Sequence, residues 1–398
     1  MTLEDPTREL LADPHGVYDR LREVSPVHRT AGPDGLPVWL VTRYEDVRQG
    51  LADPRLSLDK SHALPGNYRG FRLPSALDAN LLNMDPPDHT RIRKLVTRAF
   101  TARRVEELRK PIRRTADDLL DALTGQGRAD LIAAYAVPLP ITVICELLGV
   151  PEESRPDFRA WSDAMLLPDP AHPRRAREAV GNLLGFFAGL LAHKRERPGD
   201  DLVSALIAVR GADDGGSDDR LSEDELMSLV FLILLAGYEN SVQLIGNAVH
   251  ALLTDPAQLA LLRAEPGRTA AAVEEFARYE SPAQHAIRRF PVEDVTIGGT
   301  VIPAGETVLL CLGAANRDPD RFPDPGRLDL RRDATGHVAL GHGIHYCLGA
   351  PLARLETEVA LTALLERFPA LELDVPPSQL RRRPSVRARG LVALPVRW

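Results

Sequence analysis

The sequence predicts a mainly helical fold with a small β region, and three observations predict it. Apolar residues recur at intervals near 3.6 over residues 105–192, a pattern typical of successive amphipathic helices. A long apolar helix is predicted over residues 221–254. Alternating patterns over residues 290–312, and a strand-like run at residues 38–41, predict the β region. No break in composition divides the chain, so we expect residues 1–398 to form a single domain.

The composition is that of an ordinary soluble globular protein, with 44 % hydrophobic and 26 % charged residues. The formal net charge of -7 argues against nucleic acid or an anionic membrane as a partner. The first residues lack a basic, apolar leader, and we find no window of about 18 apolar residues. Cys145, Cys311 and Cys347 are odd in number and far apart, which favours a reducing compartment. We therefore expect a cytoplasmic protein without a membrane span.

The first helix with candidate functional residues follows Asp85-Pro86-Pro87-Asp88, which is a helix-start signal. His89 and Arg93 then lie four residues apart, on one face of that helix. Further basic residues surround them, so from the residues alone a solvated basic face is the simplest interpretation.

The long helix over residues 221–254 begins with a capping box formed by Ser222 and Glu225. Its apolar run is broken by Ala236-Gly237-Tyr238-Glu239-Asn240-Ser241. Small residues and an acid inside an otherwise buried helix indicate a functional site, because they contradict the local pattern. The alternative is a helix crossing, where small residues allow close packing.

Two features follow the long helix. Glu275 and Arg278 form an i,i+3 pair on one helix face, which by itself occurs by chance on most helices. Strands are then predicted at residues 295–297 and 301–302, joined by a Gly298-Gly299 turn, and at residues 307–311.

The stretch of residues 336–354 reads GHVALGHGIHYCLGAPLAR and precedes a helical pattern. Cys347 is framed by Gly341, Gly343 and Gly349, which let the backbone approach a flat, bulky group. Because a helix begins next to it, we expect a lowered thiol pKa and a thiolate. A lone thiolate in apolar surroundings suits haem iron as an axial ligand, since it favours O–O cleavage.

Three other interpretations of Cys347 compete. A buried cysteine is usually a small hydrophobic residue. A zinc site with His342 and His345 lacks a fourth ligand in the sequence. A catalytic Cys–His pair needs open access, which Leu348 and Pro351 restrict.

The stretch resembles the haem-ligand loop of the cytochrome P450 family. That loop has Phe, spaced glycines, His or Arg, the ligand Cys, a further Gly and then Leu-Ala-Arg. The matching residues are Gly341, Gly343, His345, Cys347, Gly349 and Leu352-Ala353-Arg354. Leu340 stands where the family has the Phe that packs under the haem. The resemblance implies a cytochrome P450-like fold of the soluble bacterial type, with Cys347 as metal ligand of heme b.

The resemblance extends to other haem contacts. It implies that His89, Arg93 and Arg289 bind the haem propionates, although Arg288 is adjacent to Arg289. It also implies that Ala236 and Gly237 face the iron. Buried carboxylates need such basic partners.

In the family, the acid of the long helix feeds protons to the reaction and is followed by Thr. The acid here is Glu239, but the next residue is Asn240, followed by Ser241. An amide donates hydrogen bonds but cannot relay a proton as a hydroxyl does. Ser241 lies about 100° away on a regular helix. We hypothesise that a water held by Asn240, or a substrate hydroxyl, completes the relay.

The resemblance also implies a structural network beneath the haem. Glu275 and Arg278 match the family's Glu-x-x-Arg, and Arg327 fits the place of the third member, an Arg from a later loop.

The implied function is a haem-thiolate monooxygenase that inserts one oxygen atom of O₂ into a small organic substrate, by hydroxylation or epoxidation. No dinucleotide fingerprint or Cys cluster for iron–sulfur is present, so we expect electrons from a ferredoxin and its NAD(P)H-driven reductase. We also expect a monomer. A basic stretch could form part of the docking face, or simply a solvated helix face: Arg103, Arg104, Arg109, Arg113 and Arg114.

Two alternatives remain at this stage. A P450-like partner protein without activity is disfavoured by Cys347, which such relatives lack. A peroxide-using enzyme is kept open by Asn240. The substrate is expected to contact residues 55–83, 160–190, 283–288 and 385–388. Few aromatic residues suggest a bulky, hydroxyl-bearing product of secondary metabolism, such as a macrolide, and we name Gln284, His285 and Ser385 as polar pocket candidates.

Overall fold

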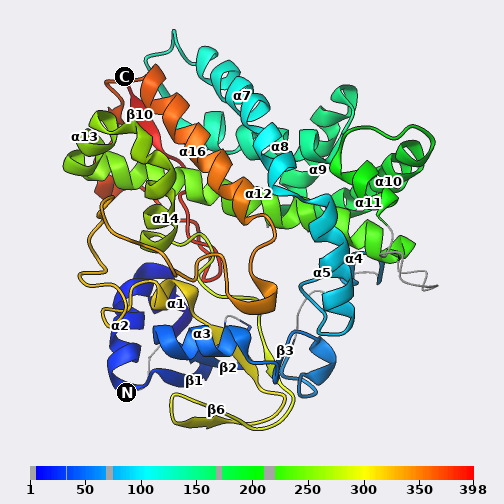
Figure 1. Ribbon diagram of the computed structural model, residues 1–398. Helices are drawn as coiled ribbons and strands as arrows, with labels where there is room; N and C mark the ends of the chain where they lie inside the picture. The colour runs from blue at the N-terminus through cyan, green and yellow to red at the C-terminus, as the bar shows by residue number, and fades with distance from the viewer. Residues whose placement is uncertain (1–5, 33, 69–74, 167–172, 210–219) are drawn as a thin grey trace.

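The computed structural model describes residues 6–32, 34–68, 75–166, 173–209 and 220–398. Most of these residues are helical and the strands are short, which confirms the predicted fold class. Figure 1 shows two regions: a large helical region, and a smaller one that combines N-terminal helices with strands. Residues 69–74 and 167–172, which fall in two segments expected to contact substrate, lie outside the described residues.

The helices follow the proline interruptions of the sequence, because proline suits the first turn of a helix but not its interior. Their bounds are α1 (Pro6–Ala12), α2 (Pro14–Val24), α3 (Tyr44–Ala52), α4 (Ser75–Asp78), α5 (Asp88–Ala99), α6 (Ala102–Glu107), α7 (Arg109–Asp121), α8 (Pro138–Leu148), α9 (Arg155–Leu166), α10 (Pro173–Glu196), α11 (Leu202–Ala208), α12 (Glu223–Thr254), α13 (Pro256–Ala264), α14 (Thr269–Tyr279), α15 (Leu312–Ala315) and α16 (Ala350–Arg367).

The strands form small, separate sheets. Their bounds are β1 (Val27–Ala31), β2 (Pro37–Val41), β3 (Leu56–Ser57), β4 (Arg128–Asp130), β5 (Phe290–Pro291), β6 (Val295–Ile297), β7 (Thr300–Ile302), β8 (Thr307–Leu310), β9 (Glu372–Leu373) and β10 (Pro395–Arg397).

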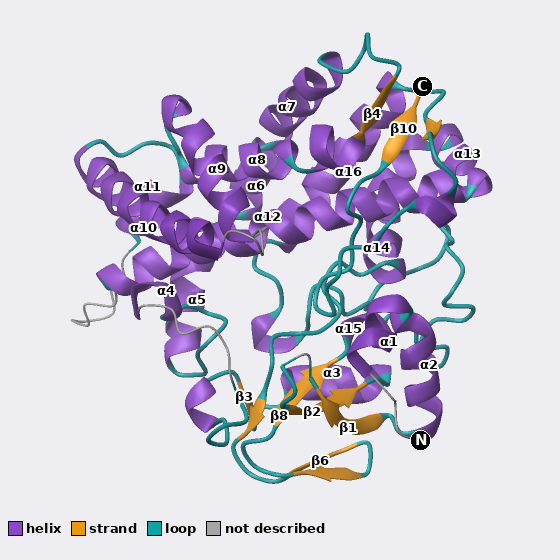
Figure 2. Cartoon of the chain, turned by 180° about the vertical axis from the view of Figure 1, so that it is seen from behind, coloured by secondary structure: helices purple, strands orange, loops and turns teal. Residues whose placement is uncertain are grey.

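The main sheet has the order β1-β2-β8, and β8 joins β2 in parallel, so the N-terminal strands and the 290–312 region share a sheet as predicted. The β6–β7 hairpin turns at Gly298 and Gly299, whose φ angles are 53° and 80°, a region that favours glycine. A further sheet, β4-β10-β9, brings the C-terminal strand beside β4 (Figure 2). Local sequence patterns did not reveal this pairing of distant segments.

The helix α12 runs through the helical region in Figure 1. Its capping box is present, with the Ser222 hydroxyl accepting from the Glu225 amide and the Glu225 carboxylate accepting from the Ser222 amide. The expectation of no long apolar window was wrong, because α12 contains an 18-residue window of mean hydropathy 1.5. That window is 67 % buried inside the protein. Its apolarity is therefore explained by its place in the core.

The main apolar core joins α12 to α8, α14 and α16. A smaller core lies beneath the β1-β2-β8 sheet and α3. The glycine-rich loop of residues 336–349 runs into α16. The loop thus enters the helix that packs against α12 and α14.

Candidate functional site

The loop that carries Cys347 folds back on itself. The Cys347 amide donates to the Leu340 carbonyl over 2.8 Å, and α16 begins at Ala350. Gly341 and Gly343 have φ angles of 77° and 73°, which only glycine adopts readily. A Cβ on Gly343 would also stand 3.1 Å from the Leu51 carbonyl of α3. The cysteine therefore lies just before a helix, as predicted, in a loop that requires its glycines.

The predicted lowering of the Cys347 pKa was wrong for the protein chain itself. Burial raises the pKa of this thiol. This effect is larger than the lowering caused by the Gly349 amide and by the cations Arg93 and Arg354. A buried thiol of this kind is neutral near pH 7. A metal ion that binds the sulfur deprotonates it outright.

A cluster of buried nitrogen atoms lies beside the loop. Within the described chain, both ring nitrogens of His89, Nε of Arg289 and Nε2 of His345 have no hydrogen-bond partner. The His89 and His345 rings are 4.1 Å apart between centroids. Burial lowers the pKa of His89 to about 4 and that of His345 to about 3, so both rings are neutral. Since unsatisfied buried donors are costly, the cluster calls for an acceptor-bearing group.

Two arginines complete this cluster. Arg93 of α5 donates through Nη2 to the Tyr346 carbonyl over 2.6 Å. Arg289 donates through Nη1 to the Leu56 carbonyl over 3.1 Å, and burial lowers its pKa to about 10. The adjacent Arg288 instead stacks on Tyr68, 4.1 Å from the ring centroid. Arg289, rather than Arg288, therefore belongs to the cluster with His89 and His345.

The residues that interrupt α12 have different surroundings. Ala236 and Asn240, one turn apart, remain accessible in a helix whose neighbouring residues are largely buried. A Cβ on Gly237 would stand 2.6 Å from Cδ1 of Ile144, so this glycine allows α8 to pack closely. Ser241 is buried and hydrogen-bonds to Glu356 of α16. Ala236 and Asn240 thus share the open face, while Gly237 and Ser241 contact neighbouring helices.

The acid of α12 has partners that the sequence did not reveal. One Glu239 carboxylate oxygen lies 3.3 Å from Nη2 of Arg387, and the other lies 3.9 Å from Nη2 of Arg383. Beside it, the Tyr238 hydroxyl donates to Asp163 of α9 over 2.6 Å. Glu239 therefore connects α12 to the loop of residues 380–394, called the C-terminal loop below, and Tyr238 connects α12 to α9.

The structural network around Glu275 contains a different arginine from the predicted one. Arg278 donates to both Glu275 oxygens over 2.6 and 2.8 Å, and both side chains are at most 1 % exposed. Arg332 supplies the third member, with Nε 3.2 Å from Glu275 Oε1. The prediction of Arg327 was wrong: its side chain is 58 % exposed and pairs with Asp324 and Asp329. The loop contacts Glu275 through the Arg332 side chain and through the Asp329 amide, which donates to Oε1 over 3.0 Å.

The predicted basic docking face is largely neutralised by acids. Each of its five arginines lies within ion-pair distance of a carboxylate, in the pairs Arg103–Glu107, Arg104–Asp200, Arg109–Glu358, Arg113–Asp117 and Arg114–Glu146. This pairing favours the interpretation of a solvated helix face.

Two of the polar pocket candidates turn into the core. The Gln284 side-chain amide donates to the Ser281 carbonyl over 2.8 Å. The His285 ring lies 2.8 Å from the Tyr18 hydroxyl and is buried. Ser385 accepts from the backbone amides of the C-terminal loop. The segment of residues 283–288 therefore contributes less polarity to a pocket than its sequence suggested.

The zinc interpretation of Cys347 finds no geometric support. In the part of the chain that the structure describes, no three His, Cys, Asp or Glu side chains come together as a metal site. The Cys145 and Cys311 thiols are buried, and burial raises the pKa of Cys145 to about 12.

Comparisons with known proteins agree with this arrangement. The family model for cytochrome P450 matches residues 174–391. The chain is 50 % identical to the cytochrome P450 monooxygenase PikC of Streptomyces venezuelae, over 98 % of this chain and 92 % of that protein. It is also 50 % identical to the vitamin D(3) 25-hydroxylase of Pseudonocardia autotrophica, over 96 % of this chain and 93 % of that protein.

A solved structure matches over nearly the full length. The cytochrome P450 PksS of the bacillaene polyketide synthase from Bacillus subtilis 168 superposes with a TM-score of 0.91 at 38 % identity, covering 99 % of both chains. The part of the chain that matches the family model, residues 174–391, contains both α12 and the Cys347 loop. The chain belongs to the cytochrome P450 family and is a monooxygenase of that family.

Proposed function

We propose that the chain binds heme b, with Cys347 as its axial ligand, and inserts one oxygen atom of O₂ into a small organic substrate. The observation that carries this proposal is the cluster of unsatisfied buried nitrogens at His89, Arg289 and His345, beside the cysteine loop. Two carboxylates of a haem would provide the acceptors that these donors lack. The residues present therefore fit the group.

When bound, the haem supplies the activation of O₂, and a thiolate ligand favours O–O cleavage. The protein does the rest. His89, Arg93 and Arg289 bind the propionates and fix the orientation of the ring. Gly341, Gly343 and Gly349 have no Cβ, so the backbone of the loop would allow the ring to approach closely. Ala236 is exposed on α12 and carries only a methyl group, so it would leave room for the bound group.

Proton delivery on the α12 side involves Glu239 and Asn240. The Asn240 amide can donate to and hold a water, but it cannot pass a proton itself. Glu239 is held by Arg387 and Arg383, 3.3 and 3.9 Å from its two carboxylate oxygens. A water at Asn240, or a hydroxyl of the substrate, completes the relay from Glu239.

The electrons come from a ferredoxin and its NAD(P)H-driven reductase. The support is the absence from the sequence of a dinucleotide fingerprint or an iron–sulfur Cys cluster. The protein is a cytoplasmic monomer, and residues 1–398 form one domain.

The substrate is a bulky, mostly apolar natural product that carries hydroxyl groups, of the macrolide or polyketide type. The side chains of Gln284 and His285 turn into the core. The segment of residues 283–288 therefore offers a substrate mainly apolar side chains, such as Ala286 and Ile287. The name of one relative supports this class, since PksS is the cytochrome P450 of a polyketide synthase.

The haem proposal is tested with a matched pair of arginine variants. Arg289→Met removes a donor of the cluster. Arg288→Met removes the neighbouring arginine, whose Nε is also buried without a partner but whose guanidinium stacks on Tyr68 and Phe290. We expect the haem content per chain to fall by about tenfold in Arg289→Met, because a buried carboxylate would lose its cation. The Arg288→Met protein should keep its haem. Equal haem content in the two variants would contradict the assignment.

The reaction is tested with ¹⁸O₂ and a panel of a macrolactone, a secosteroid and a fatty acid. We expect one ¹⁸O atom in the macrolactone product, only when ferredoxin, reductase and NAD(P)H are present. Product that forms with peroxide alone, and not with ferredoxin, would instead establish a peroxide-using enzyme.

A further inference from the structure

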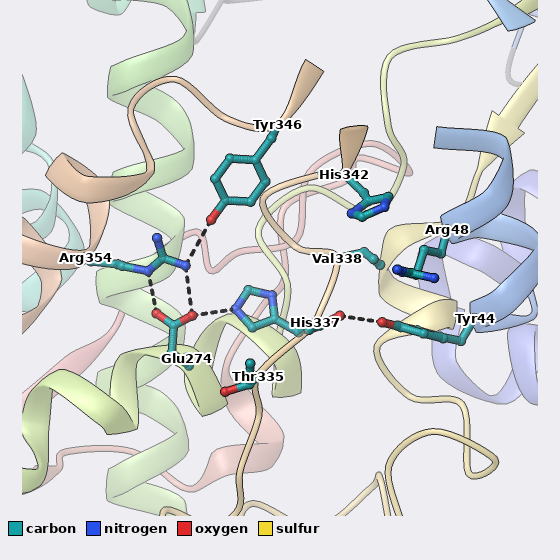
Figure 3. Close-up of a pocket in the computed structure, with 11 residues that line it drawn as sticks. Tyr44, Arg48, Glu274, Thr335, His337, Val338, His342, Tyr346 and Arg354 are labelled. Atoms are coloured by element: carbon teal, nitrogen blue, oxygen red, sulfur yellow. Dashed lines mark hydrogen bonds and ion pairs between the residues drawn. The ribbon is translucent and has the colours of Figure 1, made fainter. Parts of the chain in front are cut away.

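A pocket of about 330 Å³ lies beside the cysteine loop, and Gly341 and His342 of that loop are among its lining residues. Its lining includes Tyr346, the residue directly before Cys347. In Figure 3 the Tyr346 phenol points to Arg354, and Glu274 lies between Arg354 and His337. None of these four residues belongs to the nitrogen cluster of His89, Arg289 and His345.

Tyr346 is held at both ends. Its carbonyl accepts from Nη2 of Arg93 over 2.6 Å, and its hydroxyl lies 3.0 Å from Nη2 of Arg354. Arg93 comes from α5 and Arg354 from α16, so the residue is bound to two different helices. These two hydrogen bonds restrict the rotation of the main chain between Tyr346 and Cys347.

The anchor on the hydroxyl side is itself fixed. Arg354 donates through Nε and Nη2 to the two Glu274 oxygens, over 2.6 and 2.9 Å (Figure 3). The His337 ring lies 3.2 Å from the same carboxylate. Although burial acts to raise it, these partners lower the pKa of Glu274 to about 2, so the anchor stays ionised. Bidentate Arg–carboxylate pairs of this kind hold geometry as well as charge.

We propose that Tyr346 is a positioning residue, which fixes the main chain of Cys347 and the direction of its sulfur through the Tyr346–Arg354–Glu274 tether. The proposal rests on the haem-thiolate function proposed above. Tyr346 touches neither substrate nor reacting atoms in this role.

The pocket offers a matched control. The Tyr44 hydroxyl donates to the Gly336 carbonyl over 2.6 Å, at the other end of the same loop. Tyr44→Phe and Tyr346→Phe each remove one hydroxyl from the pocket, and both leave the ring in place. Only Tyr346→Phe releases the residue bonded to Cys347.

The experiment compares the two variants as holoenzymes. Hydrogen exchange is measured on the peptide that covers residues 339–349, together with the reduction potential and the decay of the red-shifted carbon monoxide band. We expect exchange and band decay to be about fivefold faster in Tyr346→Phe and within twofold of the parent in Tyr44→Phe, as a charge-assisted hydrogen bond is lost only next to Cys347. Equal behaviour of the two variants would overturn the proposal.

A third variant, Glu274→Gln, separates the tether from the tyrosine ring. Because the three residues act in series, the double variant Tyr346→Phe/Glu274→Gln should exchange no faster than the more affected single variant. Additive effects would refute the tether. If the parent protein shows no red-shifted band, the haem-thiolate function fails, while the exchange measurements still decide whether Tyr346 fixes the loop.

Discussion

The Glu239 carboxylate of α12 lies 3.3 Å from the guanidinium of Arg387, a residue of the C-terminal loop. That loop is itself anchored to the pocket segment, since the Gln284 amide donates to the Arg387 carbonyl and the Arg389 amide donates to the Pro282 carbonyl. An acid proposed to supply protons is thus paired with a loop expected to contact substrate. Loop position and acid availability are linked through one ion pair.

Removing this ion pair should weaken the control of the reaction by substrate. Arg387→Met releases the Glu239 carboxylate from the C-terminal loop, so we expect NAD(P)H consumption without substrate to rise about threefold, in line with an exposed ion pair. The measurement follows NADPH oxidation and peroxide release. Arg381→Met, on an exposed arginine of the same loop, is the control. Identical rates in parent and Arg387→Met would show that the pair does not restrain the acid.

Asn240 gives a second prediction, because it stands where the family has a proton-relaying Thr. If a water or a substrate hydroxyl completes the relay, Asn240→Thr should leave the product formed per NADPH within about twofold. Ser241→Ala should have a similarly small effect, since Ser241 faces Glu356 rather than the open face of α12. A large gain in coupling with Asn240→Thr would count against the relay proposed here.

The network around Glu275 predicts a contrast between two arginines of one loop. Arg332 is 10 % exposed and pairs with the buried Glu275. Arg332→Ala should therefore lower the free energy of unfolding by roughly 3 kcal/mol, because it leaves a buried carboxylate short of a partner. Arg327→Ala should change it by no more than about 0.5 kcal/mol, as for other exposed ion pairs. Chemical denaturation of the two variants checks the order, and a larger loss in Arg327→Ala would restore the predicted network.

Glu356 predicts how stability depends on pH. Burial raises the pKa of this carboxyl to about 8, which its hydrogen bond with Ser241 only partly offsets. Between its unfolded pKa, about 4.5, and 8, the unfolded chain has lost this proton while the folded chain keeps it, so stability contributed by Glu356 falls as the pH rises. Glu356→Gln should flatten this slope and gain roughly 2 kcal/mol at pH 8. Parallel pH profiles of unfolding for parent and variant would disprove the assignment.

Features set by neighbouring residues were predictable from the sequence. The capping box of Ser222 and Glu225, the Gly298-Gly299 turn and the place of Cys347 before a helix all depend on a few adjacent residues. In each case the physical requirement lies within one turn of the chain, such as an unpaired helix amide or a positive φ angle.

Features that depend on long-range packing were not predictable. The motif suggested Arg327 as the partner of Glu275, but the fold of the loop brings Arg332 there. The sequence suggested His285 as a pocket residue, but its ring lies 2.8 Å from the hydroxyl of Tyr18, a residue far away in the sequence. The Cys347 pKa followed the same rule, because burial by distant segments outweighs the local effect of the helix start.

The central claim is that Cys347 binds haem iron as a thiolate, and one spectrum tests it most directly. The protein is reduced with dithionite, exposed to carbon monoxide, and its difference spectrum is recorded. We predict a Soret band shifted strongly to the red, as thiolate-ligated ferrous haem gives, and its loss in Cys347→Ala. An unshifted band in the parent protein would mean that the loop with Leu340 does not protect a thiolate, and the absence of a haem band would contradict the proposed cofactor.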